Sequence, residues 1–262
     1  MDFGLSDKKA LVLASSRGLG LGIAEALAAE GVTVMLVGRT ADRIKANAEA
    51  ITARGKGKAY GMAADLGAEG AVEEIVALAE KTLGRIDILV NNTGGPPAKP
   101  ATEVAGDEWA KYFKTMVEPV FQITAKVLPG MRARKWGRIL TVASSGVENP
   151  IPNLALSNAL RSTIVGWSKT LSTEVAKDNV TVNMILPGRI ATDRIRELDE
   201  ANAKRSGKSM EDIQSASIAT IPAGRLGTAA EFGATAAFLC SEQAGYITGS
   251  KIRVDGGATK NV

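Results

Sequence analysis

The chain has 262 residues, of which 45% are hydrophobic and 23% charged, and this excludes a disordered, collagen-like or low-complexity protein. A net charge of +4 is too small to indicate a nucleic-acid-binding protein, and the nearest basic cluster, Arg132, Arg134, Lys135 and Arg138, is interpreted as a solvated helix end. No apolar run approaches the roughly 20 residues of a membrane span, so we expect a cytoplasmic chain with no membrane and no nucleic-acid partner.

The counts of two residue types exclude several kinds of site. Cys240 is the only cysteine, so no disulfide forms within the chain. There is no histidine, which excludes a His-based triad, a His general base and most zinc or iron sites. We therefore expect no metal.

Along the chain, apolar runs of strand length alternate with segments of helical periodicity. A strand over 10–14 and a helix over 19–30 come first, then a strand over 32–37 and a helix from the Thr40 cap to residue 54. A strand over 58–63, a helix over 68–83 and a strand over 86–90 follow. A long helical region over 107–128 contains Pro119, which we expect to bend it.

The second half continues the alternation. It predicts a strand over 138–143, a helix over 156–177 and a strand over 180–186. The stretch 189–223 is polar and only weakly periodic, and we expect it to be an insertion or substrate lid. A helix from the Thr228 cap to residue 240 and a strand over 251–254 complete the chain.

Strands separated by helices predict right-handed crossovers. The fold class is therefore α/β. We expect a single doubly wound Rossmann domain over 1–262, with a mostly parallel seven-stranded sheet and helices on both faces. Ligands of such sheets bind at the carboxyl ends of the strands, where the strand order reverses.

A glycine-containing turn joins the first strand to the first helix. Glycines in such a turn let backbone amides approach a pyrophosphate, and the helix N-terminus adds positive potential. A turn of this kind also serves tight packing alone. The candidate cofactor-binding residues here are Ser15, Ser16, Arg17, Gly18, Leu19 and Gly20.

Further motifs end the later strands in a fixed order. Asp65 follows the third strand, Asn91 to Gly94 the fourth, Ser144 the fifth, Pro187-Gly188 with Thr192 the sixth, and Asp255-Gly256-Gly257 the last. Over nearly the whole chain this combination resembles the short-chain dehydrogenase/reductase family, most closely its 3-oxoacyl-ACP-reductase-like branch.

The resemblance implies a role in binding the cofactor for most of these residues. Asn91 and Gly94 support it, Asp65 meets the adenine, and Pro187, Gly188 and Thr192 bracket the nicotinamide carboxamide. The alternatives are turn residues and a helix cap. The resemblance also implies a homotetramer, with the Pro119 helix and the 156–177 helix at one interface.

The choice of nicotinamide cofactor follows from the end of the second strand. An NAD-selective site places a carboxylate there for the ribose 2′-hydroxyl. This chain has Gly38 and then Arg39, and in the family's geometry Arg17 reaches the same ribose. Two guanidiniums without an acid suit a 2′-phosphate, so we expect NADP(H). The alternative is that both arginines are solvated surface residues.

The catalytic pattern departs from the family's. The family uses a serine, a tyrosine, a lysine four residues later and an asparagine in the preceding long helix. Ser144 matches the serine, but the tyrosine position falls on Ser157, the lysine position on Arg161 and the asparagine position on Met116. A serine hydroxyl does not ionise near neutrality and arginine stays protonated. Ser144, Ser157 and Arg161 are the candidate catalytic residues, with Arg161 also holding the nicotinamide ribose.

Three functions are compatible with this pattern. The first is an NADP(H)-dependent oxidoreductase acting on a small carbonyl or alcohol substrate, such as a 3-oxoacyl thioester, through an altered site. The second is a catalytically silent NADP(H)-binding protein with a regulatory or scaffolding role. The third is a non-redox enzyme on the same scaffold.

Overall fold

Seven parallel strands form one sheet in the computed structural model, which describes residues 2–260, and their order is β3-β2-β1-β4-β5-β6-β7. The strands are β1 (Lys9–Val12), β2 (Thr33–Gly38), β3 (Ala59–Ala63), β4 (Ile88–Asn91), β5 (Gly137–Val142), β6 (Val180–Pro187) and β7 (Lys251–Val254). Every strand pair is parallel, where the sequence predicted a mostly parallel sheet. The predicted Rossmann-type α/β fold is confirmed.

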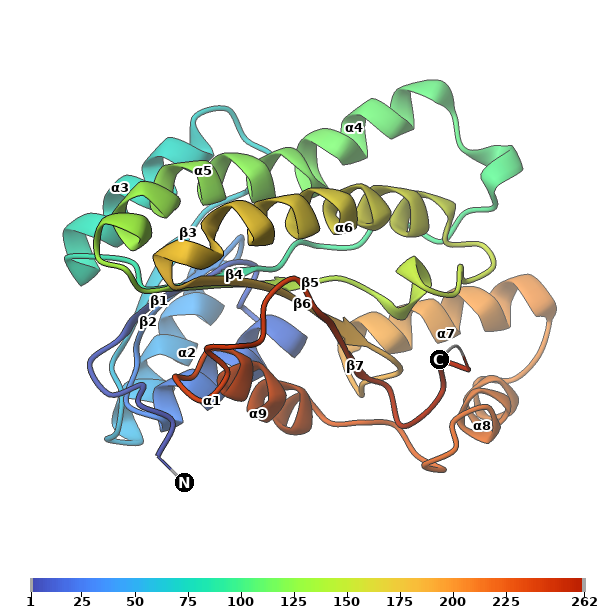
Figure 1. Ribbon diagram of the computed structural model, residues 1–262. Coiled ribbons are helices and arrows are strands. Elements are labelled where there is room, and N and C mark those ends of the chain that lie inside the picture. Colours follow the sequence, from blue (N-terminus) through green and yellow to red (C-terminus); the bar gives the residue numbers. More distant parts are fainter. Residues whose placement is uncertain (1, 261–262) are drawn as a thin grey trace.

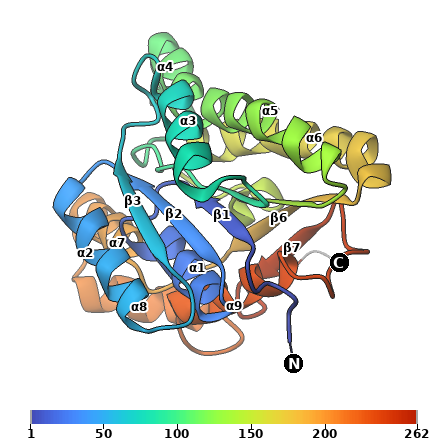
Figure 2. The same ribbon diagram turned by 90° about the vertical axis from the view of Figure 1, so that its left-hand side faces the viewer.

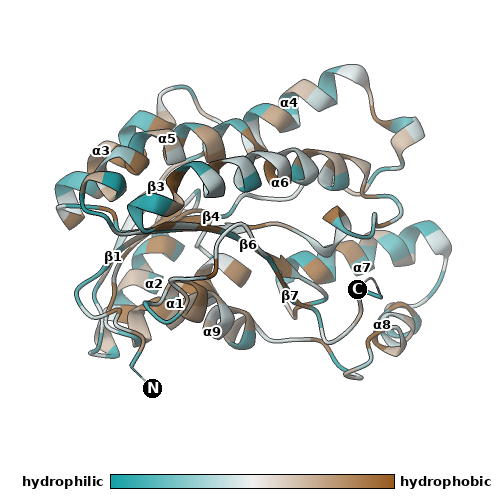
Figure 3. Ribbon diagram, in the orientation of Figure 1, coloured by the Kyte–Doolittle hydropathy of each residue, from teal (hydrophilic) through white to brown (hydrophobic). Residues whose placement is uncertain are grey.

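Helices cover both faces of the sheet (Figures 1 and 2). One face carries α1 (Gly18–Ala29), α2 (Ala41–Ala53) and α9 (Ala229–Leu239), and the other carries α3 (Ala71–Leu83), α5 (Glu118–Ala133) and α6 (Ala155–Val175), with α4 (Gly106–Met116) preceding α5. Two further helices, α7 (Asp193–Ser206) and α8 (Met210–Ala219), follow β6. In Figure 3 apolar residues gather where the helices face the sheet.

The core is divided by the sheet into two main clusters of buried side chains. On one side Phe232 of α9 and Ile23 of α1 pack with Leu36 of β2. On the other side Ile75 of α3 and Ile123 of α5 pack against the opposite face of the same strands. Because residues 10–12 of β1 and 88–90 of β4 are buried on both faces, these parts of the strands are continuous apolar runs, as is typical of parallel strands.

Two glycines let α1 and α9 approach backbone to backbone. A Cβ on Gly22 would lie 2.5 Å from the carbonyl oxygen of Ala229, and a Cβ on Gly233 would overlap the carbonyl oxygen of Gly22. Both glycines are buried. The spacing of this helix pair therefore depends on the absence of two methyl groups.

The prediction of one continuous helix over 107–128 was wrong. The chain forms two helices, α4 and α5, joined at Val117. Pro119 is the second residue of α5, where a backbone N–H has no acceptor within the helix, so the proline starts this helix instead of bending a longer one. Pro129 is the proline that lies inside α5.

The stretch 189–223 is helical, although its periodicity was weak. Thr192 caps α7 by accepting a hydrogen bond from the Ile195 N–H, and Ser209 caps α8 by accepting one from the Asp212 N–H. Few apolar side chains are needed because α7 presents only a narrow buried face to the rest of the protein. The capping residues therefore indicate these helices more clearly than the pattern of apolar residues does.

The substitution Gly233→Ala tests the contact between α1 and α9. We expect it to lower the free energy of unfolding by about 2 kcal/mol or more, because the added methyl meets a backbone oxygen that cannot rotate away. Urea denaturation measures the change. The control is Ala234→Ser on the exposed side of α9, which adds one heavy atom and should change stability by about 0.5 kcal/mol or less. Equal effects of the two substitutions would contradict the close approach.

Candidate cofactor and substrate site

A cavity of about 800 Å³ opens at the carboxyl ends of the strands. The strand order reverses between β1 and β4, and the segments that follow both strands line the cavity. The ends of β2, β5 and β6 and the helices α4, α6 and α7 complete its wall. Its size lies within the ~300–1,000 Å³ of ligand-binding pockets, and its place is where a doubly wound fold binds ligands.

Most of the residues predicted for the site lie together on this wall. They are Ser16, Arg17, Gly18, Leu19, Arg39, Asp65, Gly94, Ser144, Ser157, Arg161, Pro187, Gly188 and Thr192. They come from segments far apart in the chain, such as Arg17 in the turn after β1 and Thr192 after β6. The agreement follows from parallel topology, which brings all strand ends to one edge.

Three predicted residues, Ser15, Gly20 and Asn91, lie behind the wall instead of on it. The Ser15 hydroxyl donates to the Val12 carbonyl at 2.8 Å and accepts from the Val37 N–H at 3.0 Å, which ties β1 to β2. The Asn91 side-chain amide donates to the Thr124 hydroxyl at 3.1 Å, which ties β4 to α5. In this structure these residues support the segments that form the cavity.

The turn after β1 is held tight by two features. Gly18 has φ +59°, in the left-handed region that favours glycine, and a Cβ on Gly20 would lie 2.5 Å from the Ala14 carbonyl oxygen. Arg17 is the N-cap of α1, and its side chain makes no capping bond. The first N–H groups of α1 therefore face the cavity without a side-chain acceptor, as an anion-binding helix N-terminus requires.

Two arginines, Arg17 and Arg39, border the cavity beside this turn. Arg39 is exposed and has no ion pair within the described residues. Arg17 pairs with Asp193 at 2.9 Å and with Glu197 at 3.2 Å, both on α7. The hydrogen bond from Arg17 lowers the pKa of Asp193, so this pair is ionised at neutral pH. Arg17 thus links the glycine turn to α7, and the expectation of two guanidiniums without an acid was wrong for Arg17.

Ser144 faces the cavity from the segment after β5, and Ser157 faces it from α6. The Ser144 hydroxyl accepts from the Gly146 N–H at 3.0 Å, which leaves its own proton available. Asn158 bonds the backbone N–H and carbonyl of Ile151 and so fixes the loop before α6. Ser157 is only 8% exposed, and its hydroxyl makes no hydrogen bond within residues 2–260.

Arg161 is a buried cation, 8% exposed, on the same face of α6. Its Nη1 donates to the Val142 carbonyl at 3.0 Å and its Nη2 to the Gly94 carbonyl at 3.4 Å. Burial, and then the nearby charge of Arg194, lower the pKa of Arg161 to about 10. The guanidinium is therefore still charged at neutral pH, but it cannot take up or release a proton there.

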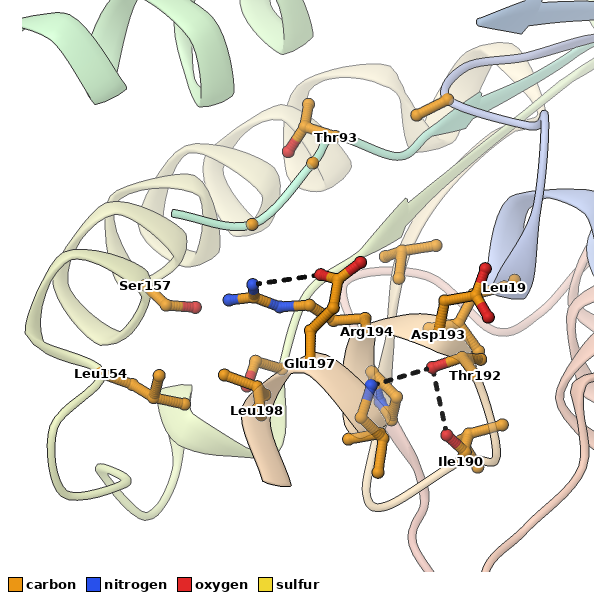
Figure 4. A pocket seen from close by; sticks show the side chains of 18 of the residues that line it. Leu19, Thr93, Leu154, Ser157, Ile190, Thr192, Asp193, Arg194, Glu197 and Leu198 are labelled. Carbon is orange, nitrogen blue, oxygen red and sulfur yellow. Dashed lines mark hydrogen bonds and ion pairs between the residues drawn. The ribbon is translucent and has the colours of Figure 1, made fainter. Parts of the chain in front are cut away.

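Sequence reasoning missed Arg194, which lies within the stretch expected to be a lid. Its Nη2 donates to the Pro96 carbonyl at 2.6 Å, and burial lowers its pKa. Figure 4 shows the Arg194 guanidinium in the cavity, with the Ser157 hydroxyl pointing toward it. The one available signal was the Thr192 cap, which places Arg194 in the first turn of a helix.

Within residues 2–260, no helix is long and apolar enough to cross a membrane, and no group of acidic, cysteine or histidine side chains is suited to hold a metal ion. Of the basic cluster near the end of α5, Arg132 and Lys135 contact Asp178, whereas Arg138 is a buried residue of β5, so the interpretation as a solvated helix end was wrong for Arg138.

Comparison with known proteins gives matches over almost the whole chain. Residues 13–259 match the family model described as enoyl-(acyl carrier protein) reductase. The chain is 35% identical over 252 residues to 3-oxoacyl-[acyl-carrier-protein] reductase FabG of Salmonella typhimurium, which covers 95% of this chain and 96% of that protein.

Solved structures are similar over the same length. L-sorbose reductase from Gluconobacter frateurii, complexed with NADPH and L-sorbose, has a TM-score of 0.94 and 33% identity over 100% of both chains. YwfH, described as an NADPH-dependent reductase involved in bacilysin biosynthesis, has a TM-score of 0.93 and 29% identity, and covers 98% of this chain and 100% of its own.

The link between Arg17 and α7 can be tested by hydrogen exchange at neutral pH. We expect Arg17→Ala to speed amide exchange in α7 about two- to fivefold, because two exposed ion pairs between segments are lost. Arg196→Ala is the matched control, since Arg196 pairs with Asp193 and Glu200 inside α7 alone. Unchanged exchange in Arg17→Ala, or equal effects of both substitutions, would show that Arg17 does not hold α7.

Proposed function

The chain belongs to the short-chain dehydrogenase/reductase family, and we propose that it is an NADP(H)-dependent oxidoreductase that reduces a small carbonyl compound or oxidises the matching alcohol. The observation that carries this proposal is a single cavity that joins the glycine turn, with Arg17 and Arg39, to Ser144, Ser157 and Arg161. One end suits a phosphorylated dinucleotide, and the other offers hydrogen-bond donors for a substrate oxygen. The 3-oxoacyl thioesters named for the FabG relatives are one candidate substrate.

The residues present fit a dinucleotide. The N–H groups at the start of α1 suit the pyrophosphate, and Gly18 and Gly20 keep this turn close to the strand ends. Asp65 and Gly94 line the cavity at the ends of β3 and β4, where the family holds the adenine and the centre of the cofactor. Pro187, Gly188 and Thr192, after β6, complete the nicotinamide end.

The preference for NADP(H) rests on charge at the end of β2. Gly38 carries no side chain that could bond a 2′-hydroxyl, and Arg39 follows it with no carboxylate partner among the described residues. Arg17 lies on the same wall, but its guanidinium is paired with Asp193 and Glu197, so the preference rests on Arg39. A guanidinium binds a phosphate through paired donors. The NADPH named for two similar structures supports the same cofactor here.

At the other end of the cavity the chain's own residues orient the reacting oxygen. When bound, NADPH supplies the hydride. The hydroxyls of Ser144 and Ser157 donate to the carbonyl oxygen, directly or through water, and Arg161 holds the nicotinamide ribose and stabilises negative charge as it develops on that oxygen. Water must deliver the proton, because neither serine nor arginine supplies one near neutral pH.

The altered residues set the expected rate. Ser157, Arg161 and Met116 stand where the family uses tyrosine, lysine and asparagine. Loss of general acid catalysis typically costs about 10²–10⁴ in rate, while positioning and electrostatic stabilisation remain. The same substitutions favour a second function, a catalytically silent NADP(H)-binding protein with a regulatory or scaffolding role. A non-redox enzyme on this scaffold is the third.

Two further features complete the proposal. The stretch 189–223 forms the substrate side of the cavity through α7 and serves as its lid, which Arg17 holds to the glycine turn. The chain assembles as a homotetramer through α5 and α6. Half-buried aromatic residues near these helices support this assembly, among them Phe121 and Trp167, whose ring centroids lie 4.7 Å apart.

Steady-state oxidation of NADPH against a panel of small ketones, oxo acids and 3-oxoacyl thioesters tests the oxidoreductase. We expect slow turnover with at least one class, reduced about 10-fold or more by Ser144→Ala, because that serine orients the carbonyl. Tight NADPH binding with no turnover of any substrate contradicts the enzyme and favours the silent binding protein.

The substitution Arg39→Ala tests the choice of cofactor. We expect the Kd for NADPH to rise about 10-fold or more while the Kd for NADH changes less than threefold, because only NADPH carries the phosphate. Calorimetry measures both values. Lys45→Ala, an exposed cation on α2 outside the cavity wall, is the control and should affect neither. An equal loss for both cofactors in Arg39→Ala would refute the phosphate assignment.

A further inference from the structure

Two guanidiniums from different helices converge on the loop that follows β4. Arg161 of α6 donates to the Gly94 carbonyl and Arg194 of α7 donates to the Pro96 carbonyl. A Cβ on Gly95, between these carbonyls, would lie 3.1 Å from Nη2 of Arg194, so that guanidinium rests against the Gly95 backbone. Two positive charges thus share one short segment of the cavity wall.

Arg161 has no carboxylate partner among the described residues, and Arg194 shares Glu197 with Arg17. No acidic group lies within ion-pair distance of Arg161 in the described part of the chain, and both its hydrogen bonds go to backbone carbonyls. The carboxylate nearest to Arg194 is Glu197, at 3.9 Å, and Glu197 makes its shorter contact, 3.2 Å, with Arg17. The positive charge at this end of the cavity is therefore incompletely neutralised by the protein.

Arg161 is a buried guanidinium without a counterion within residues 2–260, which is unfavourable for the fold, whereas the Arg194 side chain is 37% exposed. Burial lowers the pKa of both arginines, the charge of Arg194 lowers that of Arg161 further, and Glu197 partly opposes the lowering at Arg194. A bound anion would offset this positive charge, because paired donors on arginine match the two oxygens of a carboxylate.

The position of Ser157 relates such an anion to the carbonyl group that reacts. Ser157 and Arg161 are four residues apart on α6, so their side chains lie one helical turn apart on the same face. The Ser157 hydroxyl points toward Arg194 across the cavity (Figure 4). A substrate carbonyl bonded to Ser157 thus lies in the part of the cavity that both guanidiniums line.

We propose that the substrate is a small oxo acid, whose carboxylate binds Arg194 in the positive field of Arg161 while its carbonyl oxygen meets Ser157. This inference rests on the proposed oxidoreductase and names its substrate class. A 2- or 3-oxo acid has the necessary short spacing between carbonyl and carboxylate. A 3-oxoacyl thioester carries no charge there and leaves the two arginines without a substrate anion.

The hydride of the reaction comes from the cofactor, and the proton comes from water. Bound NADPH would supply the hydride to the carbonyl carbon as the C=O π bond breaks, and the oxygen would take one proton from water through the serine hydroxyls, with the hydroxide left behind neutralised by solvent. The products are the hydroxy acid and NADP⁺. Arg194 holds the carboxylate in both states, and both arginines supply positive charge beside the forming alkoxide.

Arg194→Gln tests the anion site with matched neutral and charged substrates. The substrates are 2-oxobutanoate and acetoacetate, each compared with its methyl ester, and the acetoacetyl thioester of N-acetylcysteamine. For the wild-type protein we expect kcat/KM to favour the acids over the esters and the thioester. In Arg194→Gln we expect KM for the acids to rise about 10- to 100-fold, and KM for the esters and the Kd for NADPH to change less than threefold.

The control is Arg196→Gln, two residues along α7, whose side chain is exposed and pairs within the helix. We expect it to leave all three values unchanged. Loss of NADPH affinity in Arg194→Gln would show that the arginines bind a cofactor phosphate and would overturn the inference. Equal use of acids and esters by the wild-type protein would also overturn it, while leaving the proposed oxidoreductase intact.

A binding measurement keeps the two proposals separable. Oxamate is a carboxylate that resembles a 2-oxo acid and is not reduced, and it is titrated into the protein with saturating NADPH. We expect heat of binding in the wild type that is lost in Arg194→Gln. Heat without turnover of any carbonyl would sustain the anion site and refute the oxidoreductase, and absence of heat in the wild type would refute the anion site.

Discussion

The constraint on which the rest of the structure depends is that all seven strands are parallel and their order reverses between β1 and β4. Parallel strands bring every carboxyl end to one edge, and at the reversal the connections leave toward opposite faces, so a crevice opens there. Glycines, hydroxyl groups and cations follow the strands in this chain, so the parallel topology alone brings them together in the cavity. The α1–α9 and α3–α5 layers fix the sheet that makes this possible.

The two ends of the cavity carry different sets of charged and polar groups. One end has the unbonded amides of α1 with Arg17 and Arg39, and the other has Arg161 and Arg194 beside two serine hydroxyls. The second end lacks a group that changes protonation near neutral pH, so it favours fixed electrostatic stabilisation over proton transfer. A site built in this way suits a substrate that brings negative charge, which connects the unusual residues on α6 with the arginine on α7.

The fold and most of the cavity wall could be predicted because they depend on local patterns. Buried strands such as β2 read as continuous apolar runs, and residues such as Ser144 and Gly188 directly follow strands, so their place was fixed once the topology was known. The position of Pro119 was misread because a proline inside a periodic run and one at the start of a new helix look alike in sequence. Only the break at Val117 separates them.

Other features could not be predicted from the sequence. The polar segment that forms α7 reaches the cavity through long-range pairs, Arg17 with Asp193 and Arg189 with Asp199, and neither leaves a periodic signal. Arg194 was missed for this reason. Ser15 and Asn91 were placed near the correct strands, but whether a side chain points into a cavity or braces the sheet behind it depends on packing that spacing does not report.

The central claim is that this scaffold binds a phosphorylated nicotinamide dinucleotide at the reversal between β1 and β4. Calorimetric titration of the unmodified protein with NADPH and with NADH tests it most directly. The account predicts saturable binding of NADPH, at least 10-fold tighter than that of NADH. Absence of binding heat with both coenzymes would contradict it.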